Sequence, residues 1–262
     1  MTQLHVDDFG QGVPAVFVHG SFGWGLDTFP DQRALSDSYR VMLIDRRGFG
    51  RSSPIAAGGW PVDSEDLADL LADLGSAHLV GQSYGAVVAL VMASRYPERV
   101  RSLVVIEPPA FGLAQDDPYV KATTQLLGPV FERASTMSAR EFLEAWAAAT
   151  GMTEERYANW SGAFGEMDWS AVEASRLEAW PGDAPIDLDA LRNATFPKVV
   201  VRGAWKPADG EVSNRGKDFA AICCVLAEQI GARLVVFEGS SHNPQLQEPV
   251  AFNELLLDAW SG

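Results

Sequence analysis

Short apolar runs alternate with helical patterns along the first part of the chain, and this alternation restricts the fold more than any other feature of the sequence. Four apolar runs of strand length, each ending in a turn signal, cover residues 15–20, 40–48, 77–83 and 100–108. They are apolar on both faces, as parallel strands are when helices cover both sides of a sheet. Residues 64–75 and 84–100, which lie between the runs, have helical patterns. The alternation predicts a doubly wound, mostly parallel α/β sheet with right-handed crossovers.

A helical insertion is expected to interrupt this sheet. From about residue 113 to residue 196 the sequence has helical patterns and no strand-like run. Strand-like runs resume at 198–203 and 232–239, and a helical stretch follows each of them. We therefore expect residues 1–112 and 197–262 to form one α/β core and residues 113–196 to form a helical cap on it.

Charge argues against several classes of partner. The 262 residues carry 20 Lys and Arg against 35 Asp and Glu, a formal net charge of −15. Such a surface repels phosphate backbones and anionic lipid headgroups, so we expect neither a nucleic-acid nor a membrane partner. The N-terminal residues contain no signal-peptide pattern, and no apolar run is long enough to cross a bilayer. These observations predict a cytoplasmic protein.

Cofactor and metal sites are not expected either. The only cysteines, Cys223 and Cys224, are adjacent, which suits neither a disulfide framework nor a metal site. The four histidines are scattered, and no phosphate-binding or dinucleotide-binding glycine pattern is present. We therefore predict a protein without metal or cofactor.

Ser83 stands between two glycines in the stretch HLVGQSYGAVVAL, with Gly81 and Gly85 two residues to either side. The pattern G-x-S-x-G at the end of an apolar strand is typical of a tight strand-to-helix turn, where a side chain at either flank would clash with crossing backbone. Such a turn presents the serine hydroxyl clear of the sheet. This position makes Ser83 the candidate nucleophile.

A serine nucleophile needs a base within hydrogen-bond reach. His242 follows the last strand-like run, so it lies at the carboxyl edge of the sheet together with Ser83. His78 begins the strand that carries Ser83 and lies at the opposite edge, and His5 has no motif around it. His242 is therefore the candidate base, and a capping or surface histidine is the alternative interpretation.

Two backbone N–H groups at the same edge could stabilise an oxyanion. Tyr84 follows the nucleophile and begins the next helix, which directs its N–H toward the turn. The segment after His19 and Gly20 can supply the second donor, for which we favour Ser21, with Phe22 as its neighbour. We expect His19 itself to brace this loop.

These motifs together resemble those of the α/β-hydrolases. The resemblance covers nearly the whole chain and rests on H-G at 19–20, D-x-R-G-x-G-x-S at 45–52, G-x-S-x-G at 81–85 and the late His242, in the family's order. It implies an α/β-hydrolase fold with a helical cap and a Ser-His-acid triad, and it allows a homodimer. The segment at 45–52 is structural by this resemblance, and we assign it no catalytic role.

The resemblance leaves two candidates for the acid. Much of the family carries an aspartate after the strand that follows the cap, where this chain has Lys206, with Asp209 three residues further on. Another branch, similar to zearalenone-hydrolysing lactonases, places the acid after the strand before the cap, where this chain has Glu107. Two prolines follow Glu107 and stiffen the chain there, which suits a carboxylate that holds an imidazole. We favour Glu107 over Asp209.

Aromatic residues of the expected cap and nearby loops predict an apolar pocket, although aromatics at helical spacing are usually core residues. The candidate substrate-binding residues are Phe22, Trp24, Phe111, Trp146 and Trp160. The sequence therefore predicts a serine esterase or lactonase, a carboxylic ester hydrolase, that acts on a small hydrophobic or aromatic molecule.

Other chemistry on the same fold stays open. A C–C bond hydrolase, a lyase or a cofactor-independent dioxygenase could use the same Ser/His pair, and a ligand receptor without turnover could keep it. Dehalogenases and epoxide hydrolases of the fold need an aspartate where this chain has Ser83, which argues against both.

Overall fold

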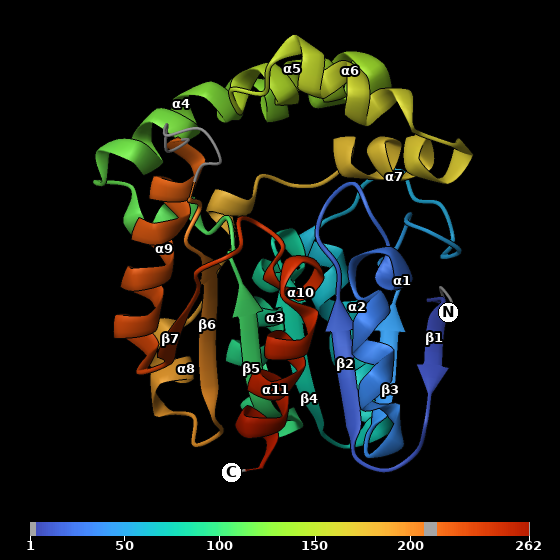
Figure 1. Ribbon diagram of the computed structural model, residues 1–262, viewed down its shortest axis with the longest axis vertical. Coiled ribbons are helices and arrows are strands. Elements are labelled where there is room, and N and C mark those ends of the chain that lie inside the picture. The colour runs from blue at the N-terminus through green and yellow to red at the C-terminus, as the bar shows by residue number, and fades with distance from the viewer. Residues whose placement is uncertain (1–3, 207–213, 262) are drawn as a thin grey trace.

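A seven-stranded sheet forms the centre of the molecule (Figure 1). The computed structural model describes residues 4–206 and 214–261. The strand order is β1-β3-β2-β4-β5-β6-β7, and only β1 runs antiparallel to its neighbour. The strands are β1 (Val6–Phe9), β2 (Pro14–Val18), β3 (Arg40–Ile44), β4 (Ala77–Gln82), β5 (Val100–Ile106), β6 (Lys198–Gly203) and β7 (Arg233–Phe237). The doubly wound, mostly parallel sheet predicted from the sequence is therefore confirmed.

The central strands are apolar on both faces because helices cover both sides. Val16 and Val18 of β2 face one hydrophobic cluster, while Ala15 and Phe17 of the same strand face another. The first cluster includes residues of α2 (Trp60–Leu74), α3 (Tyr84–Arg95), α8 (Leu188–Asn193) and α9 (Asn214–Ile230). The second includes residues of α11 (Pro249–Trp260), which lies in front of the sheet in Figure 1, with α3 behind it. Two short helices, α1 (Gly25–Thr28) and α10 (Pro244–Gln247), lie in the loops after β2 and β7.

Four consecutive helices lie above the carboxyl edge of the sheet, at the top of Figure 1. They are α4 (Pro118–Arg133), α5 (Ala139–Ala149), α6 (Glu154–Gly162) and α7 (Glu166–Arg176), and we call them the cap helices. Short polar residues begin three of them: the side chains of Asp117, Ser138 and Thr153 each accept from first-turn backbone N–H groups. All four lie within residues 113–196, for which the sequence predicts helices only.

The sequence-predicted elements match the structure with one clear shift. The helix expected over 64–75 is α2, which already begins at Trp60 because Pro61 fits a first helical turn. Within residues 4–206 and 214–261, no helix is both long and apolar enough to cross a membrane. Cys223 is buried, Cys224 is exposed, and both are free thiols.

Candidate active site

Ser83 occupies a strained turn between β4 and α3. Its backbone angles are φ 52° and ψ −121°, in the left-handed region that a non-glycine residue rarely adopts. A Cβ on Gly85 would lie 2.3 Å from the carbonyl oxygens of Val18 and His19, and a Cβ on Gly81 would lie 2.6 Å from the carbonyl oxygen of Gly85. The flanking glycines are therefore required by the close approach of β2 and of the first turn of α3, as the G-x-S-x-G pattern predicts.

His242 and Glu107 contact each other across a long sequence separation. The Nδ1 atom of His242, in the loop between β7 and α10, lies 2.7 Å from Oε2 of Glu107. Glu107 directly follows β5, is fully buried and has a φ of 42°. Its other oxygen, Oε1, accepts from the backbone N–H of Gly203 at 2.9 Å and from the indole N–H of Trp205 at 2.7 Å. Both carboxylate oxygens are thus engaged, and one of them orients the imidazole.

The other candidate acid is Asp209, in the segment after β6. Asp209 lies outside the described residues. Lys206, at the position where much of the family carries its acid, points to solvent and pairs with Glu238 at 2.6 Å. Gly203, the last residue of β6, and Trp205 in the loop after it instead supply the two donors that hold Glu107 in place.

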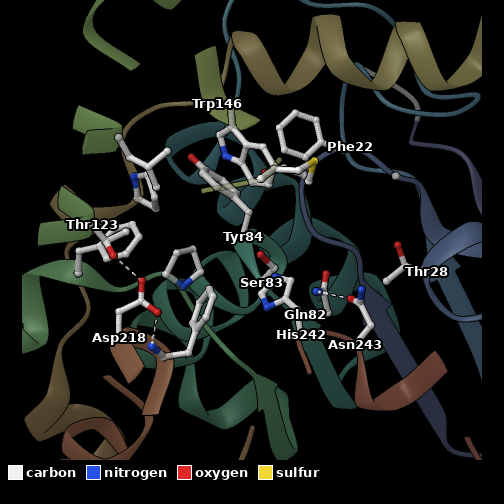
Figure 2. A pocket seen from close by; sticks show the side chains of 18 of the residues that line it. Phe22, Thr28, Gln82, Ser83, Tyr84, Thr123, Trp146, Asp218, His242 and Asn243 are labelled. Atoms are coloured by element: carbon white, nitrogen blue, oxygen red, sulfur yellow. Dashed lines mark hydrogen bonds between the residues drawn. The ribbon is translucent and has the colours of Figure 1, made fainter. Parts of the chain in front are cut away.

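Ser83 and His242 line one cavity of about 320 Å³ between the sheet edge and the cap helices (Figure 2). The expected oxyanion residues Ser21 and Tyr84 line it as well. In the described parts of the chain, neither of these two residues uses its backbone N–H in a hydrogen bond, whereas the N–H of Phe22 donates to the Ser175 hydroxyl at 2.8 Å. Ser21 and Tyr84 are therefore the better suited pair of donors.

Four of the five residues expected to bind substrate lie around the cavity. Phe22, Phe111, Trp146 and Trp160 line it, and the ring of Phe22 lies 4.7 Å from that of Trp146. Trp24 does not line it but packs against Phe49 and the small residues of α7. The expectation for Trp24 is therefore not met, because its contacts with Phe49 and α7 join residues far apart in the chain, which sequence spacing does not reveal.

Comparison with known proteins identifies the family. A family model described as "Alpha/beta hydrolase family" matches residues 15–255. The chain belongs to the α/β-hydrolase family.

Curated α/β-hydrolases similar to this chain act on different substrates. It is 29% identical over 271 residues to the pimeloyl-[acyl-carrier protein] methyl ester esterase of Aeromonas hydrophila, covering 97% of each chain. It is 31% identical over 276 residues to a 2-hydroxy-6-oxononadienedioate/2-hydroxy-6-oxononatrienedioate hydrolase from Pseudomonas sp., covering 97% of this chain and 90% of the relative.

A solved structure gives a similar result. Est816, described as an N-acyl homoserine lactone degrading enzyme, superposes with a TM-score of 0.61 at 27% identity, covering 98% of this chain and 96% of that one. Esterases and lactone-degrading enzymes therefore stand among the proteins that this α/β-hydrolase resembles.

Several residues that line the cavity of this α/β-hydrolase are not predicted by the sequence. Phe219 of α9 packs its ring 4.7 Å from that of His242, and Asp218 beside it accepts from the Thr123 hydroxyl at 2.6 Å. Asn243 accepts from the side-chain amide of Gln82 at 3.0 Å (Figure 2). Gln82 and Asn243 could have been found as chain neighbours of Ser83 and His242, but nothing in the sequence connects α4 and α9 with the site.

Charged groups around the cavity are unevenly distributed. The described residues that line it include Asp27 and Asp218 but no lysine or arginine. In the same parts of the chain, no group of three or more His, Cys, Asp and Glu side chains could hold a metal ion. The walls are otherwise mainly apolar, so the described part of the lining offers no lysine or arginine to an anionic ligand.

His19 braces the loop after β2. Its Nε2 accepts from the backbone N–H of Arg46 at 2.9 Å, so its Nδ1 carries the proton that reaches the Gly20 carbonyl at 2.7 Å. Burial and the nearby Arg46 guanidinium hold the pKa of His19 well below its usual value. The imidazole therefore stays neutral and acts as a fixed hydrogen-bonding link.

Proposed function

We propose that this α/β-hydrolase is a serine esterase or lactonase that acts on an uncharged small molecule with a hydrophobic or aromatic body. One observation carries the proposal: the contact of 2.7 Å between His242 Nδ1 and the buried Glu107, in a cavity that Ser83 also lines. A carboxylate at Nδ1 leaves Nε2 as the atom that takes a proton from a hydroxyl.

The reaction follows from this geometry. Ser83 Oγ attacks the ester carbonyl while His242 Nε2 takes the hydroxyl proton, and Glu107 stabilises the resulting imidazolium. The N–H groups of Ser21 and Tyr84 bind the oxygen that becomes negative. His242 then returns the proton to the leaving alcohol oxygen, and an acyl-enzyme on Ser83 remains. Water activated by His242 releases the acid and restores the free serine.

The cavity favours uncharged substrates. A dioate such as the substrate named for the Pseudomonas relative carries two carboxylates, and no described lining residue is a lysine or arginine that could pair with them. Burying an unpaired carboxylate costs several kcal/mol, on the order of the affinity of a weak ligand. A neutral ester or lactone carries no such cost, and the lactone-degrading Est816 supports a cyclic ester as one form of it.

A second candidate is the cleavage of a C–C bond in an uncharged ketone. The 31% identity with the dioate hydrolase over 97% of this chain favours it. The same Ser/His pair would serve, so a panel of neutral esters, lactones and diketones decides between the two reactions by product analysis.

The first experiment is a stopped-flow burst assay with p-nitrophenyl butyrate. Wild type is expected to release about one equivalent of p-nitrophenol per protein before steady turnover, because acylation outpaces deacylation with activated esters. Ser83→Ala is expected to lose both phases. Cys224→Ala is the matched control, because Cys224 is an exposed free thiol that an activated ester could acylate. Turnover retained in Ser83→Ala, or absent from wild type across the ester and lactone panel, would contradict the proposal.

A further inference from the structure

A buried ion-pair cluster lies behind the loop that follows β2. Its centre is Arg46, whose side chain is 1% exposed and contacts Asp63 at 2.7 Å and Glu178 at 2.6 Å. Asp63 belongs to α2, whereas Glu178 follows the last of the cap helices. Burial raises the pKa of Asp63 to about 6 and that of Glu178 to about 7, against the opposing effect of Arg46. None of the three residues lines the cavity, so the proposed reaction does not use them directly.

Arg46, together with His19, holds the peptide that carries the Ser21 N–H. Its Nη2 donates to the Gly20 carbonyl at 2.9 Å, and its Nε donates to the His19 carbonyl at 3.0 Å. In a trans peptide the carbonyl and the following N–H point in opposite directions. Holding the Gly20 oxygen on the side of Arg46 therefore directs the Ser21 N–H away from the cluster, and Ser21 lines the cavity.

Glu178 reaches the same loop by two routes. Its Oε1 accepts from the Nη2 of Arg46, the atom that also binds the Gly20 carbonyl. Its Oε2 accepts from the Ser21 hydroxyl at 2.5 Å. One buried carboxylate thus restrains both the peptide before Ser21 and the side chain of Ser21.

Neighbours of Glu178 contact Phe22, which follows Ser21, and Tyr84, the other expected donor. The Ser175 hydroxyl accepts from the N–H of Phe22, a residue with a φ of 65°. The Tyr84 hydroxyl donates to the Ala179 carbonyl at 2.7 Å. Burial keeps the pKa of Tyr84 well above its usual value, so this hydroxyl stays protonated and able to donate. Residues 175–179 therefore contact both of the residues whose N–H groups would stabilise the oxyanion.

We propose that residues 175–179, with Glu178 at their centre and Arg46 as intermediary, form a positioning element through which the cap sets the direction of the oxyanion donors. Glu178 is a positioning residue, not a catalytic one, because it acts through Ser21 and Arg46. The proposal rests on the proposed serine hydrolase function. It implies that the end of the cap contributes to rate enhancement and not only to substrate selection.

The test compares Glu178→Gln with wild type by two measurements. The first is kcat and KM for a neutral ester, and the second is the affinity for an aryl trifluoromethyl ketone, whose adduct with Ser83 carries an oxyanion. We expect kcat and the ketone affinity to fall together by roughly 10- to 100-fold with KM nearly unchanged, because a misdirected donor weakens only interactions with the developing charge. Glu173→Gln is the matched control, because Glu173 on the preceding helix α7 pairs with Arg176 and is half exposed.

A second pair of variants keeps the test valid if Glu178→Gln does not fold. Ser21→Thr retains the hydroxyl that donates to Glu178. Ser21→Val introduces a side chain of the same shape as threonine but without the hydroxyl. We expect Ser21→Val to have about a 10-fold lower kcat and ketone affinity than Ser21→Thr, at similar KM.

The possible outcomes are distinct. Equal kcat and ketone affinity in Ser21→Thr and Ser21→Val would overturn the positioning role, as would a loss in Glu178→Gln that appears only in KM. A wild type that neither turns over esters nor binds the ketone would contradict the serine hydrolase function itself.

Discussion

Backbone strain at single residues gathers around the cavity. Among the described residues, the non-glycine residues with positive φ are Phe22, Ser83, Glu107 and Trp205. Two of them are proposed to act in catalysis, one lines the cavity, and Trp205 donates to Glu107. Conformations of this kind cost on the order of 1–3 kcal/mol each, so stability is lost where the site needs a defined geometry.

Strain at Ser83 predicts a gain of stability on loss of function. Ser83→Gly is expected to raise the free energy of unfolding by about 1 kcal/mol, because glycine adopts a φ of 52° without steric penalty. Ser83→Ala, which keeps the Cβ, is expected to remain near wild type in stability. Denaturant unfolding measures both variants, and a Ser83→Gly protein less stable than Ser83→Ala would contradict the expectation.

Variants of Glu107 and Asp209 test which carboxylate supports His242, the proposed base. Glu107→Gln is expected to reduce kcat by roughly 10³- to 10⁴-fold, because His242 loses the charge that stabilises its protonated form. Asp209→Asn is expected to keep nearly full activity, since Glu107 already lies 2.7 Å from His242 Nδ1. Steady-state kinetics of the two variants on one ester decides between them, and the reverse ranking would assign the acid to Asp209.

Substitution of Trp205 is expected to lower kcat less than substitution of Glu107 does. Trp205→Phe keeps an aromatic ring beside Phe219 but removes the N–H that donates to Glu107 Oε1. We expect kcat to fall by about 10-fold, which corresponds to one lost hydrogen bond to a charged group. Trp205→Phe combined with Glu107→Gln should then lose no more than Glu107→Gln alone, and additive losses would argue against this coupling.

At the scale of elements, local capping signals specify the cap helices. In α5 the Ser138 hydroxyl accepts from the Glu141 N–H while Glu141 accepts from the Ser138 N–H. This reciprocal pair is readable from the sequence S-A-R-E alone. The sequence pattern does not predict the path of residues 175–179 back to the sheet edge. The contacts of these residues with Ser21, Phe22 and Tyr84 join elements that lie far apart in the chain.

Removal of the N-terminal capping residue of α5, Ser138, is expected to change local stability. Ser138→Ala is expected to lower the free energy of unfolding by about 1 kcal/mol with little change in kcat, because this end of the helix is exposed and does not line the cavity. Ser138→Asp should restore most of the loss, since aspartate also caps helices. Thermal unfolding with parallel kinetics measures both, and a large change in kcat would show that the cap helices transmit local fraying to the site.

At the scale of the whole molecule, the two edges of the sheet differ in role. The carboxyl edge carries the candidate site, whereas His78 lies at the opposite edge, stacked on Trp260 at 5.0 Å and within 2.8 Å of the Ser102 hydroxyl. Burial and the nearby Arg101 lower the pKa of His78 to about 4. This histidine therefore contributes to global stability and not to the proposed reaction.

The lowered pKa of His78 predicts that the free energy of unfolding falls at acid pH. Because its folded pKa of about 4 lies below the usual histidine value of 6.5, the unfolded chain binds a proton more readily. The contribution is complete above pH 6.5 and declines as the pH falls toward 4, by up to about 3 kcal/mol. Denaturant unfolding between pH 8 and pH 4, roughly the range of histidine titration, should show wild type losing stability relative to His78→Gln. Parallel curves for the two proteins would contradict this assignment.

The sequence by itself determined the parallel sheet, the helical stretch at 113–196 and the turn at Ser83, because hydrophobic periodicity and glycine spacing act over a few residues. It also brought Ser83, Glu107 and His242 to one edge, since parallel strands share their carboxyl edge. Only the tertiary structure decided that Trp205 supports Glu107, that Trp24 packs away from the cavity, and that Glu178 holds the loop at Ser21. These contacts join residues separated by up to 157 positions, and their geometry depends on how the chain packs as a whole.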